Sequence, residues 1–359
     1  GIKKKEPNIK ISLDKIKIKF DLEKIQLYFT TVEPKIIYQD IRIPITEINI
    51  YSKISSILKS KNEINRTIVK LQNFKTDDIQ KLAIRIKPSN FKTYLLNNLD
   101  KGEIEKILID VEFDKDLNIT NYKINGSAKK INIKIFDDLL IQDVNLNFIS
   151  DKNLTLINSI RANYQGFSIS NGSISMKRNK KIEIEGKFTS QFNFNEDKAK
   201  KLFSKFNLNF LEKIKMNAQG SLLHKFTLVI DKNFKLIDYE YKTSGNILKS
   251  KIILKDQFRT SFIERPINKI SIFKTNLEIN LNKKKQNFLM FNGLYNLGGL
   301  ENKKFKVFYD LNLKNPKYSL DFNLPENIFL EAINYTSNLK NKSNIKSEFK
   351  IINDNIIFK

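Results

Sequence analysis

The sequence predicts a mainly β protein, a long antiparallel meander that curls into an elongated groove formed by an open, twisted sheet. Apolar and polar residues alternate with period two along most of the 359 residues, which places the apolar side chains of each strand on one face. Turn signals separate the alternating segments at short intervals, as expected for a meander. A closed β-sandwich is the alternative fold, because sheets with one apolar face commonly pack against a second sheet.

Eight segments carry the alternation most clearly. In the first, Ile16, Ile18 and Phe20 alternate with Lys17 and Lys19, so a strand there has one apolar face and one basic face. The eight segments are residues 16–22, 41–45, 131–135, 144–148, 167–169, 181–185, 277–281 and 309–313. Hairpin turns are expected at Asn125-Gly126, Asn171-Gly172, residues 151–153, residues 231–233 and Gly298-Gly299.

Helices are expected to be few and short, at the edges of the sheet. Asn195 is placed to cap a helix, because two acidic residues follow it and favour a helix N-terminus. Thr76 starts a second helix, and residues 91–99 form a third that Gly102 ends. Residues 51–58 and 326–333 are two further candidates.

The sequence marks no sharp domain boundary, because it contains no linker rich in Pro, Gly or Ser. Glycine–serine pairs recur at Gly126, Gly172 and Gly220, at nearly equal intervals, which suggests a repeated unit of several strands. Changes in pattern near residues 91 and 251 predict three parts. These are an N-terminal β segment with short helices (1–90), a β-groove region (91–250) and a further β-strand segment (251–359).

The residue types argue against an enzyme. Cys is absent and there is one His, which excludes thiolate metal sites and leaves one candidate for a His-dependent triad. His224 falls inside an alternating segment, and we expect it to be a structural residue on the polar face. The acidic pairs Asp77-Asp78 and Asp137-Asp138 are expected to have no catalytic role. No cofactor, metal site or catalytic residue is predicted.

The formal net charge of +25 raises the possibility of nucleic-acid binding. However, only seven of the 64 basic residues are Arg, the side chain whose planar fork binds bases and phosphates bidentately. The lysines are spread along nearly every segment, as on a solvated surface, and no nucleic acid is expected as a partner. No apolar run approaches the roughly 20 residues that a membrane-spanning helix needs.

A series of short segments resembles the bacterial AsmA-like superfamily of envelope proteins (TamB/AsmA-related), and most closely its YhdP-type members. The series consists of YLLNNLDKGEI (94–104), YKINGS (122–127), IQDVNLNF (141–148), LTL (154–156), ANYQG (162–166), ISNGSI (169–174) and IEIEG (182–186). VEPKI (32–36) and IRIP (41–44) are similar to the N-terminal part of these proteins. The chain has no N-terminal membrane anchor and no Trp and is shorter than a full member, so we expect a central fragment of a longer protein.

The resemblance implies a function in lipid transport and outer membrane biogenesis. Such proteins are implied to be periplasmic β structures that are anchored to the inner membrane and conduct phospholipid towards the outer membrane in a hydrophobic groove. For this chain the implied ligand is phospholipid. The implied partners are other envelope proteins and the inner membrane, which would be reached through a segment absent here.

Ten apolar residues are expected to line the groove. They are Ile131, Ile133, Ile135, Val144, Leu146, Phe148, Ile182, Ile184, Phe226 and Leu228. Plain core packing is the alternative for each of them. Two alternative functions also stay open: a structural or assembly factor of the cell envelope that offers sheet edges to a partner, and a basic nucleic-acid-binding protein.

Overall fold

A computed structural model gives the fold of the chain. It describes residues 8–22, 26–52, 64–85, 93, 96–134, 140–203, 214–231, 233, 235–260, 263–283, 287–299, 301–311, 317–323, 329–330, 334–336, 344–352 and 355–358. The described residues are mainly β, with antiparallel pairing and an open sheet, which confirms the predicted fold class. No helix among them is both long enough and apolar enough to cross a membrane.

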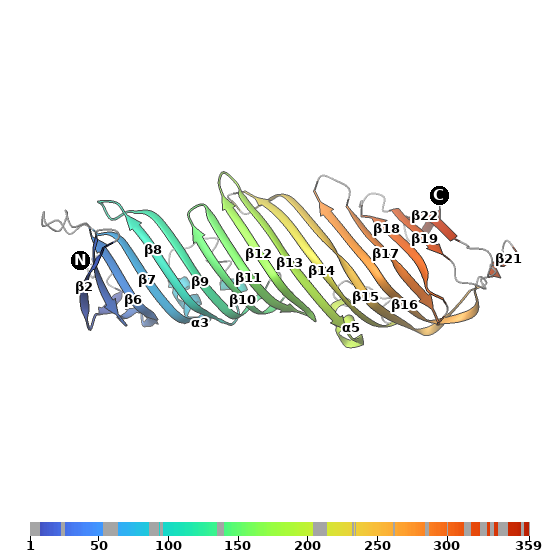
Figure 1. Cartoon of the computed structure of the whole chain (residues 1–359), viewed down its shortest axis with the longest axis horizontal. Helices are drawn as coiled ribbons and strands as arrows, with labels where there is room; N and C mark the ends of the chain where they lie inside the picture. Colours follow the sequence, from blue (N-terminus) through green and yellow to red (C-terminus); the bar gives the residue numbers. More distant parts are fainter. Residues whose placement is uncertain are drawn as a thin grey trace. The chain divides into compact units, whose positions relative to one another are not determined.

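The chain forms two compact units, Gly1–Tyr164 with Asn171–Ile182 (unit 1) and Gln165–Ser170 with Glu183–Lys359 (unit 2). The main strands that lie in unit 1 are β2 (Ile16–Asp21), β3 (Gln26–Val32), β6 (Ile45–Ser52), β7 (Ile64–Lys75), β8 (Glu103–Phe113), β9 (Ile119–Lys134), β10 (Leu140–Asp151) and β11 (Leu154–Tyr164). Each pairs antiparallel with the next in this order. Strands β6–β10 are seen side by side in Figure 1. A separate small sheet contains β1 (Ile9–Ser12), β4 (Lys35–Tyr38) and β5 (Ile41–Ile43).

The main strands of unit 2 are again sequential neighbours. They are β14 (Ile214–Ile230), β15 (Leu236–Thr260), β16 (Ile263–Asn282), β17 (Phe288–Leu297), β18 (Lys303–Asp310), β19 (Lys317–Asn323), β22 (Asn344–Ile352) and β23 (Asn355–Phe358). The strand β13 (Ile182–Phe194) precedes β14, and β12 (Phe167–Arg178) has residues in both units. Two short strands, β20 (Phe329–Leu330) and β21 (Tyr335–Thr336), form a separate pair.

Two of the predicted helices begin as expected. The helix α3 (Thr76–Arg85) starts at Thr76, and α5 (Glu196–Phe203) follows Asn195, whose Oδ1 accepts a hydrogen bond from the backbone N–H of Lys198 at 3.1 Å. In the third, residues 93 and 96–98 are helical. The two further candidates are wrong where the structure describes them, because residues 51–52 belong to β6 and residues 329–330 to β20; the rest of both segments lies outside the described residues.

The predicted turns have two outcomes. Residues 151–153, 231–233 and Gly298-Gly299 do connect strands, and the Asp151 carboxylate accepts hydrogen bonds from the backbone N–H groups of Asn153 and Leu154. Asn125-Gly126 and Asn171-Gly172 are not turns, because they lie inside β9 and β12. Two predicted strands are also shorter than expected: Pro44 separates β5 from β6, and β18 ends at residue 310.

The compact units of the structure bear on the predicted division of the chain, and the positions of the strands bear on the predicted repeat. The two compact units meet in sequence near residues 165–183, whereas residue 251 lies inside the uninterrupted strand β15. The predicted boundaries at 90 and 250 stay predictions. The glycine–serine pairs fall in β9, β12 and β14, so unequal numbers of strands separate them and they do not mark a unit of constant strand number.

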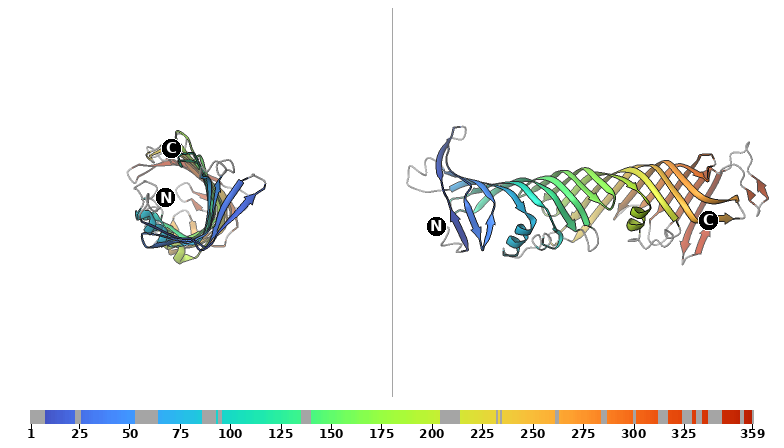
Figure 2. Two further views of the ribbon diagram at one scale, coloured as in Figure 1. Left: turned by 90° about the vertical axis from the view of Figure 1, so that its left-hand side faces the viewer. Right: turned by 90° about the horizontal axis from the view of Figure 1, so that it is seen from below.

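A series of backbone irregularities bends the strands. Six non-glycine strand residues have φ between 43° and 55°: Asn73, Lys130, Asp143, Ser159, Asn171 and Lys274. Such a φ is uncommon outside glycine and marks β-bulges, where two successive residues oppose one on the neighbouring strand. The strand registers shift next to Lys130, Asp143, Ser159 and Lys274. Bulges increase twist and bend a sheet, and the strands in Figure 2 are visibly curved.

Side chains of the polar face satisfy the backbone at two of these bulges in unit 1. The Lys130 N–H donates to Asn145 Oδ1 and the Asp143 N–H donates to Asn132 Oδ1, both at 3.2 Å. Both hydrogen bonds are exposed to solvent, where an intramolecular hydrogen bond still contributes about 0.5–1.5 kcal/mol. These asparagines therefore stabilise the curvature.

Candidate functional site

Five of the predicted groove residues share one face of β9 and β10 in unit 1. Directly paired residues of neighbouring strands point to the same side of a sheet. Ile131 pairs with Val144, Leu146 with Ala128, and Phe148 with Gly126. Ile133 follows two residues after Ile131 and lies on the same face. Ile135 lies outside the described residues.

The same face continues across the other strands of unit 1. On one side, Gly126 pairs with Ile107 of β8, which pairs with Leu71 of β7. On the other side, Gly126 pairs with Phe148, which pairs with Ile157 of β11. We call this side of the sheet the apolar face of unit 1. Its members are mostly aliphatic.

The chain itself covers one end of this face. Leu99 bridges to Ile133, and the Asn132 N–H donates to the Lys101 carbonyl at 2.8 Å. A Cβ atom on Gly102 would lie only 2.6 Å from the Ile131 Cα, so the segment packs closely there. Ile131 and Val144 are consequently core residues, with exposed fractions of 6% and 4%.

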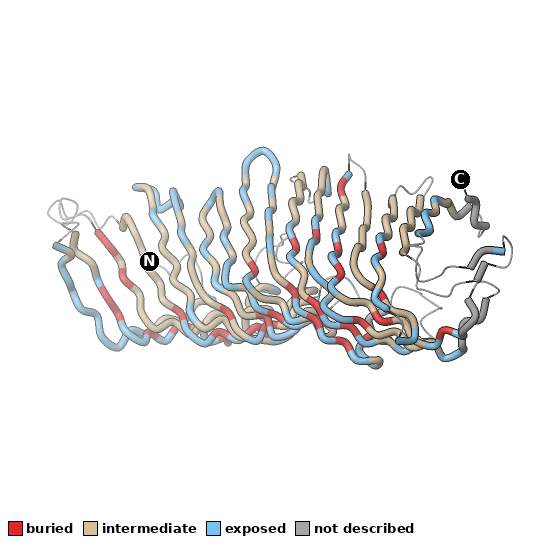
Figure 3. The backbone as a smooth tube through the Cα atoms, turned by 45° about the vertical axis from the view of Figure 1, so that its right-hand side comes forward, coloured by how far each residue is buried: buried red, intermediate tan, exposed pale blue. Residues whose placement is uncertain are grey.

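Away from this cover, the face is half-buried. Ile133, Leu146 and Phe148 have intermediate exposure, and so do Ile107 and Ile157. Figure 3 shows the difference, with buried residues gathered in a band near one end of the strands and intermediate ones further along them. Apolar side chains in this state retain surface that a ligand can remove from water.

In unit 2, Ile184, Phe226 and Leu228 lie on one face of β13 and β14. The Phe226 ring lies over Gly186, where an added Cβ would come 2.2 Å from its Cζ, and Ile184 is two residues before that glycine. Phe226 pairs with Tyr241 of β15 and Leu228 with Tyr239. Ile182, the last residue of unit 1, alternates in step with Ile184 along β13. All four predicted residues have intermediate exposure.

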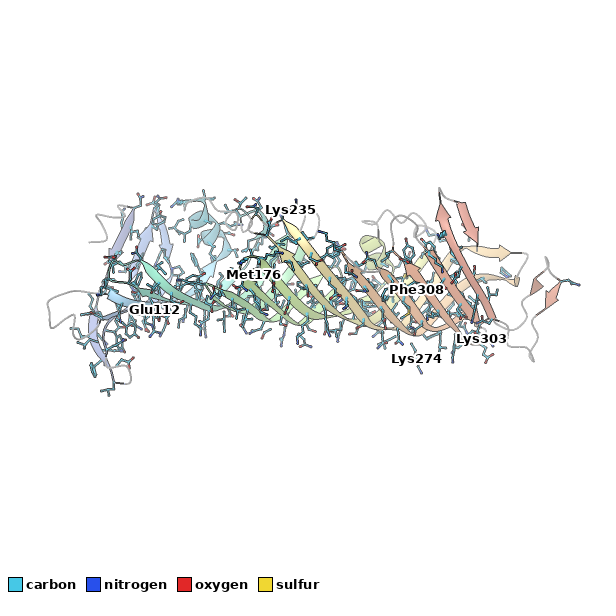
Figure 4. All side chains as sticks on the ribbon, turned by 90° about the horizontal axis from the view of Figure 1, so that it is seen from above. Glu112, Met176, Lys235, Lys274, Lys303 and Phe308 are labelled. Carbon is cyan, nitrogen blue, oxygen red and sulfur yellow. The ribbon has the colours of Figure 1, made fainter. Side chains whose placement is uncertain are left out.

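This apolar face of unit 2 is the concave one. Ile247 of β15 shares this face with Phe226. The register pairs Ile247 with Thr275 of β16. Lys274, which precedes Thr275, projects outward from the convex side of the sheet in Figure 4. On β14, β15 and β16 the alternation therefore places the lysines mainly on the convex side and apolar side chains mainly on the concave side.

Two rows of aromatic rings extend the apolar face of unit 2, and the sequence analysis missed them. Tyr309, Tyr318 and Phe349 form one row, with ring centroids 4.3 and 5.0 Å apart. Tyr295, Phe305 and Phe322 form the other, with centroids 5.5–6.1 Å apart. Burial raises the pKa of Tyr295 to about 12, and burial together with the hydrogen bond to Tyr309 raises the pKa of Tyr318 to about 12. Aromatic residues four apart, and so on one face, in each of β17, β18 and β19 are the signal that could have revealed these rows.

A polar cluster interrupts the apolar face of unit 2. His224 Nε2 lies 2.7 Å from Ser190 Oγ, and its Nδ1 lies 2.7 Å from Tyr241 Oη and 3.0 Å from Thr243 Oγ1. The Phe188 ring stacks on the imidazole at 4.4 Å. Burial lowers the pKa of His224 to about 4, so the ring is neutral at pH 7.

The expectation that His224 lies on the polar face is wrong, because it shares the face of Phe226, two residues further on. Although Ser190 and His224 are within hydrogen-bond distance, Ser190 is only 2% exposed and His224 only 8%. A substrate carbonyl cannot reach such a hydroxyl, and the other ring nitrogen is already hydrogen-bonded. The cluster therefore links β13, β14 and β15 instead of forming a nucleophile.

No group of three or more potential metal ligands occurs among the residues that the structure describes. Comparison with known proteins finds no matching family model, no matching curated protein and no matching solved structure. The resemblance to AsmA-like proteins therefore stays a prediction, and so do the location and partners that it implies. What the geometry offers is a half-exposed apolar surface in each unit.

Proposed function

We propose that the chain is a non-enzymatic lipid-handling module of the cell envelope, of the AsmA/YhdP-like kind, which holds phospholipid acyl chains for transport between the inner and outer membranes. One observation carries the proposal: in each unit, apolar side chains of intermediate exposure occupy one face over successive strands. A second layer of the protein would normally bury such a face. Acyl chains supply the same cover.

The energetics favour this ligand. Burial of each methylene contributes about 0.8 kcal/mol, so a few tens of methylenes in two acyl chains are ample to hold a lipid out of water. The mechanism is passive. Acyl chains slide along an apolar wall, strand backbones keep the wall stiff, and the headgroup stays at the wet rim.

The test uses adjacent leucines that point to opposite faces of β14 in unit 2. Leu222 pairs with Gly245 on the apolar face, whereas Leu223 lies on the other face and is 39% exposed. Leu222→Asp places a charge where acyl chains bind. We expect lipid that co-purifies with the chain, measured by mass spectrometry, to fall about tenfold, because a lost leucine contact is worth roughly 1.5–3 kcal/mol. Leu223→Asp is the matched control and should keep the lipid.

A second matched pair in unit 1 guards against a folding defect. Ile157 is on the apolar face opposite Phe148, and Leu156 is on the polar face opposite Ile149. Ile157→Asp should lose lipid and Leu156→Asp should not, while circular dichroism confirms that all four variants are folded. Equal lipid content in folded variants of both faces, or purified chain without lipid, would refute the proposal and leave a structural role in the envelope.

A further inference from the structure

The strand β2 has one partner. It pairs with β3 from Ile16 opposite Thr31 to Asp21 opposite Gln26, and no strand within the described part of the chain pairs with its other edge. An unpaired strand side offers backbone N–H and C=O groups to another strand. Proteins commonly bind extended segments in this way.

The apolar side chains of β2 are unusually exposed. Ile16, Ile18 and Phe20 are 59%, 68% and 46% exposed, and they alternate along the strand. The register pairs Ile18 with Phe29, which in turn pairs with Ile50. The exposed row therefore continues the apolar face of unit 1 to the edge of the sheet, and an added strand must place apolar residues at alternate positions to extend it.

The opposite face of β2 carries Lys17 and Lys19, with Lys15 just before the strand and Asp21 at its end. Lys15, Lys17 and Lys19 alternate with the apolar row and are all exposed. The charge of Lys19 contributes to lowering the pKa of Glu47, whose carboxylate is paired with Lys70 at 3.0 Å. Opposite charges that face each other on neighbouring strands stabilise pairing, and like charges oppose it.

We propose that the free edge of β2 binds a strand of a protein partner in which apolar residues alternate with Asp or Glu. The apolar residues would cover Ile16, Ile18 and Phe20, and the carboxylates would face the three lysines. A second copy of the chain fits less well, because its net charge is +25 and lysines alternate along its own strands. The inference does not depend on lipid binding.

The probe is a fluorescein-labelled peptide of about eight residues that alternates Glu and Val, long enough to span one strand. A peptide that alternates Lys and Val is its control. We expect the full chain to bind the acidic peptide at least about tenfold more tightly in fluorescence anisotropy at low salt, given the contribution of facing charges. Hydrogen exchange should slow at the amides of residues 16–21, because strand pairing occupies backbone groups.

Charge reversal decides whether the contact lies at this edge. The triple variant K15E/K17E/K19E should prefer the basic peptide, which exchanges the specificity of the two probes. The variant K177E/K187E/K225E changes three exposed lysines of β12, β13 and β14 and should behave as the unmodified chain. Equal effects of the two variants, unchanged exchange at residues 16–21, or a dimer that forms through β2 would each overturn the proposal.

Discussion

Acidification from pH 7 to pH 4 is expected to destabilise the chain through its single histidine. Burial lowers the pKa of His224 from 6.5 to about 4 in the folded state. The unfolded chain binds this proton near pH 6.5, whereas the folded chain binds it only near pH 4. Because the unfolded state binds more protons in between, the free energy of unfolding falls as the pH falls through this window. The total loss is roughly 3 kcal/mol, since each pKa unit corresponds to about 1.4 kcal/mol.

Urea unfolding at several pH values between 7 and 4 measures this loss. The variant His224→Gln keeps hydrogen-bonding capacity but cannot titrate, so its stability should depend less on pH. Folding also lowers the pKa values of Glu47, Asp114 and Asp151, and these groups weaken both proteins equally in acid. The difference between the two curves therefore isolates the histidine.

The imidazole can also be observed directly by NMR, because the chain contains one His. Its ring resonances should titrate with a midpoint near 4. A midpoint near 6.5, with equal pH dependence of the two proteins in urea, would show that water reaches the ring and that the Ser190–Tyr241–Thr243 contacts do not enclose it.

The alternation predicted where strands lie and which residues share a face, but it could not follow bulges. Each bulge places two successive residues on the same side, as Lys129 and Lys130 do before Ile131 on β9. A face extrapolated along the strand by period two would therefore be inverted beyond that point. Consecutive polar residues within an alternating run are the local signal of such a bulge.

The remaining wrong predictions arise where contacts between segments distant in sequence determine the structure. Asn125-Gly126 has the composition of a tight turn, yet it lies inside β9, where it pairs with β8 on one side and β10 on the other. Likewise, Ile131 and Ile133 look equivalent in the sequence. Only the packing of Gly102 against Ile131 makes one of them a core residue, and pattern alone cannot show this.

The variant Gly245→Ala is expected to destabilise unit 2 strongly. An added Cβ would lie 2.2 Å from the Ser221 carbonyl oxygen and 2.7 Å from the Leu222 Cα. Both are backbone atoms of the paired strand β14, so neither can move without breaking the ladder. Alanine normally stabilises a strand relative to glycine by about 0.5–1 kcal/mol, but overpacking of this kind costs about 1–3 kcal/mol or more. We expect a net loss of about 2 kcal/mol in urea unfolding, because the steric term is the larger.

Gly186→Ala provides the contrast that tests the steric reason. There the added Cβ would meet the end of the Phe226 ring at 2.2 Å, which is the tip of a side chain and can be removed. The double variant Gly186→Ala/Phe226→Leu should therefore recover most of the stability that Gly186→Ala loses, relative to Phe226→Leu alone. No side-chain truncation should rescue Gly245→Ala, because its clash is with backbone. Equal stability of Gly245→Ala and the unmodified chain would contradict the register that pairs Leu222 of β14 with Gly245 of β15. The assignment of Leu222 to the apolar face would then be wrong as well.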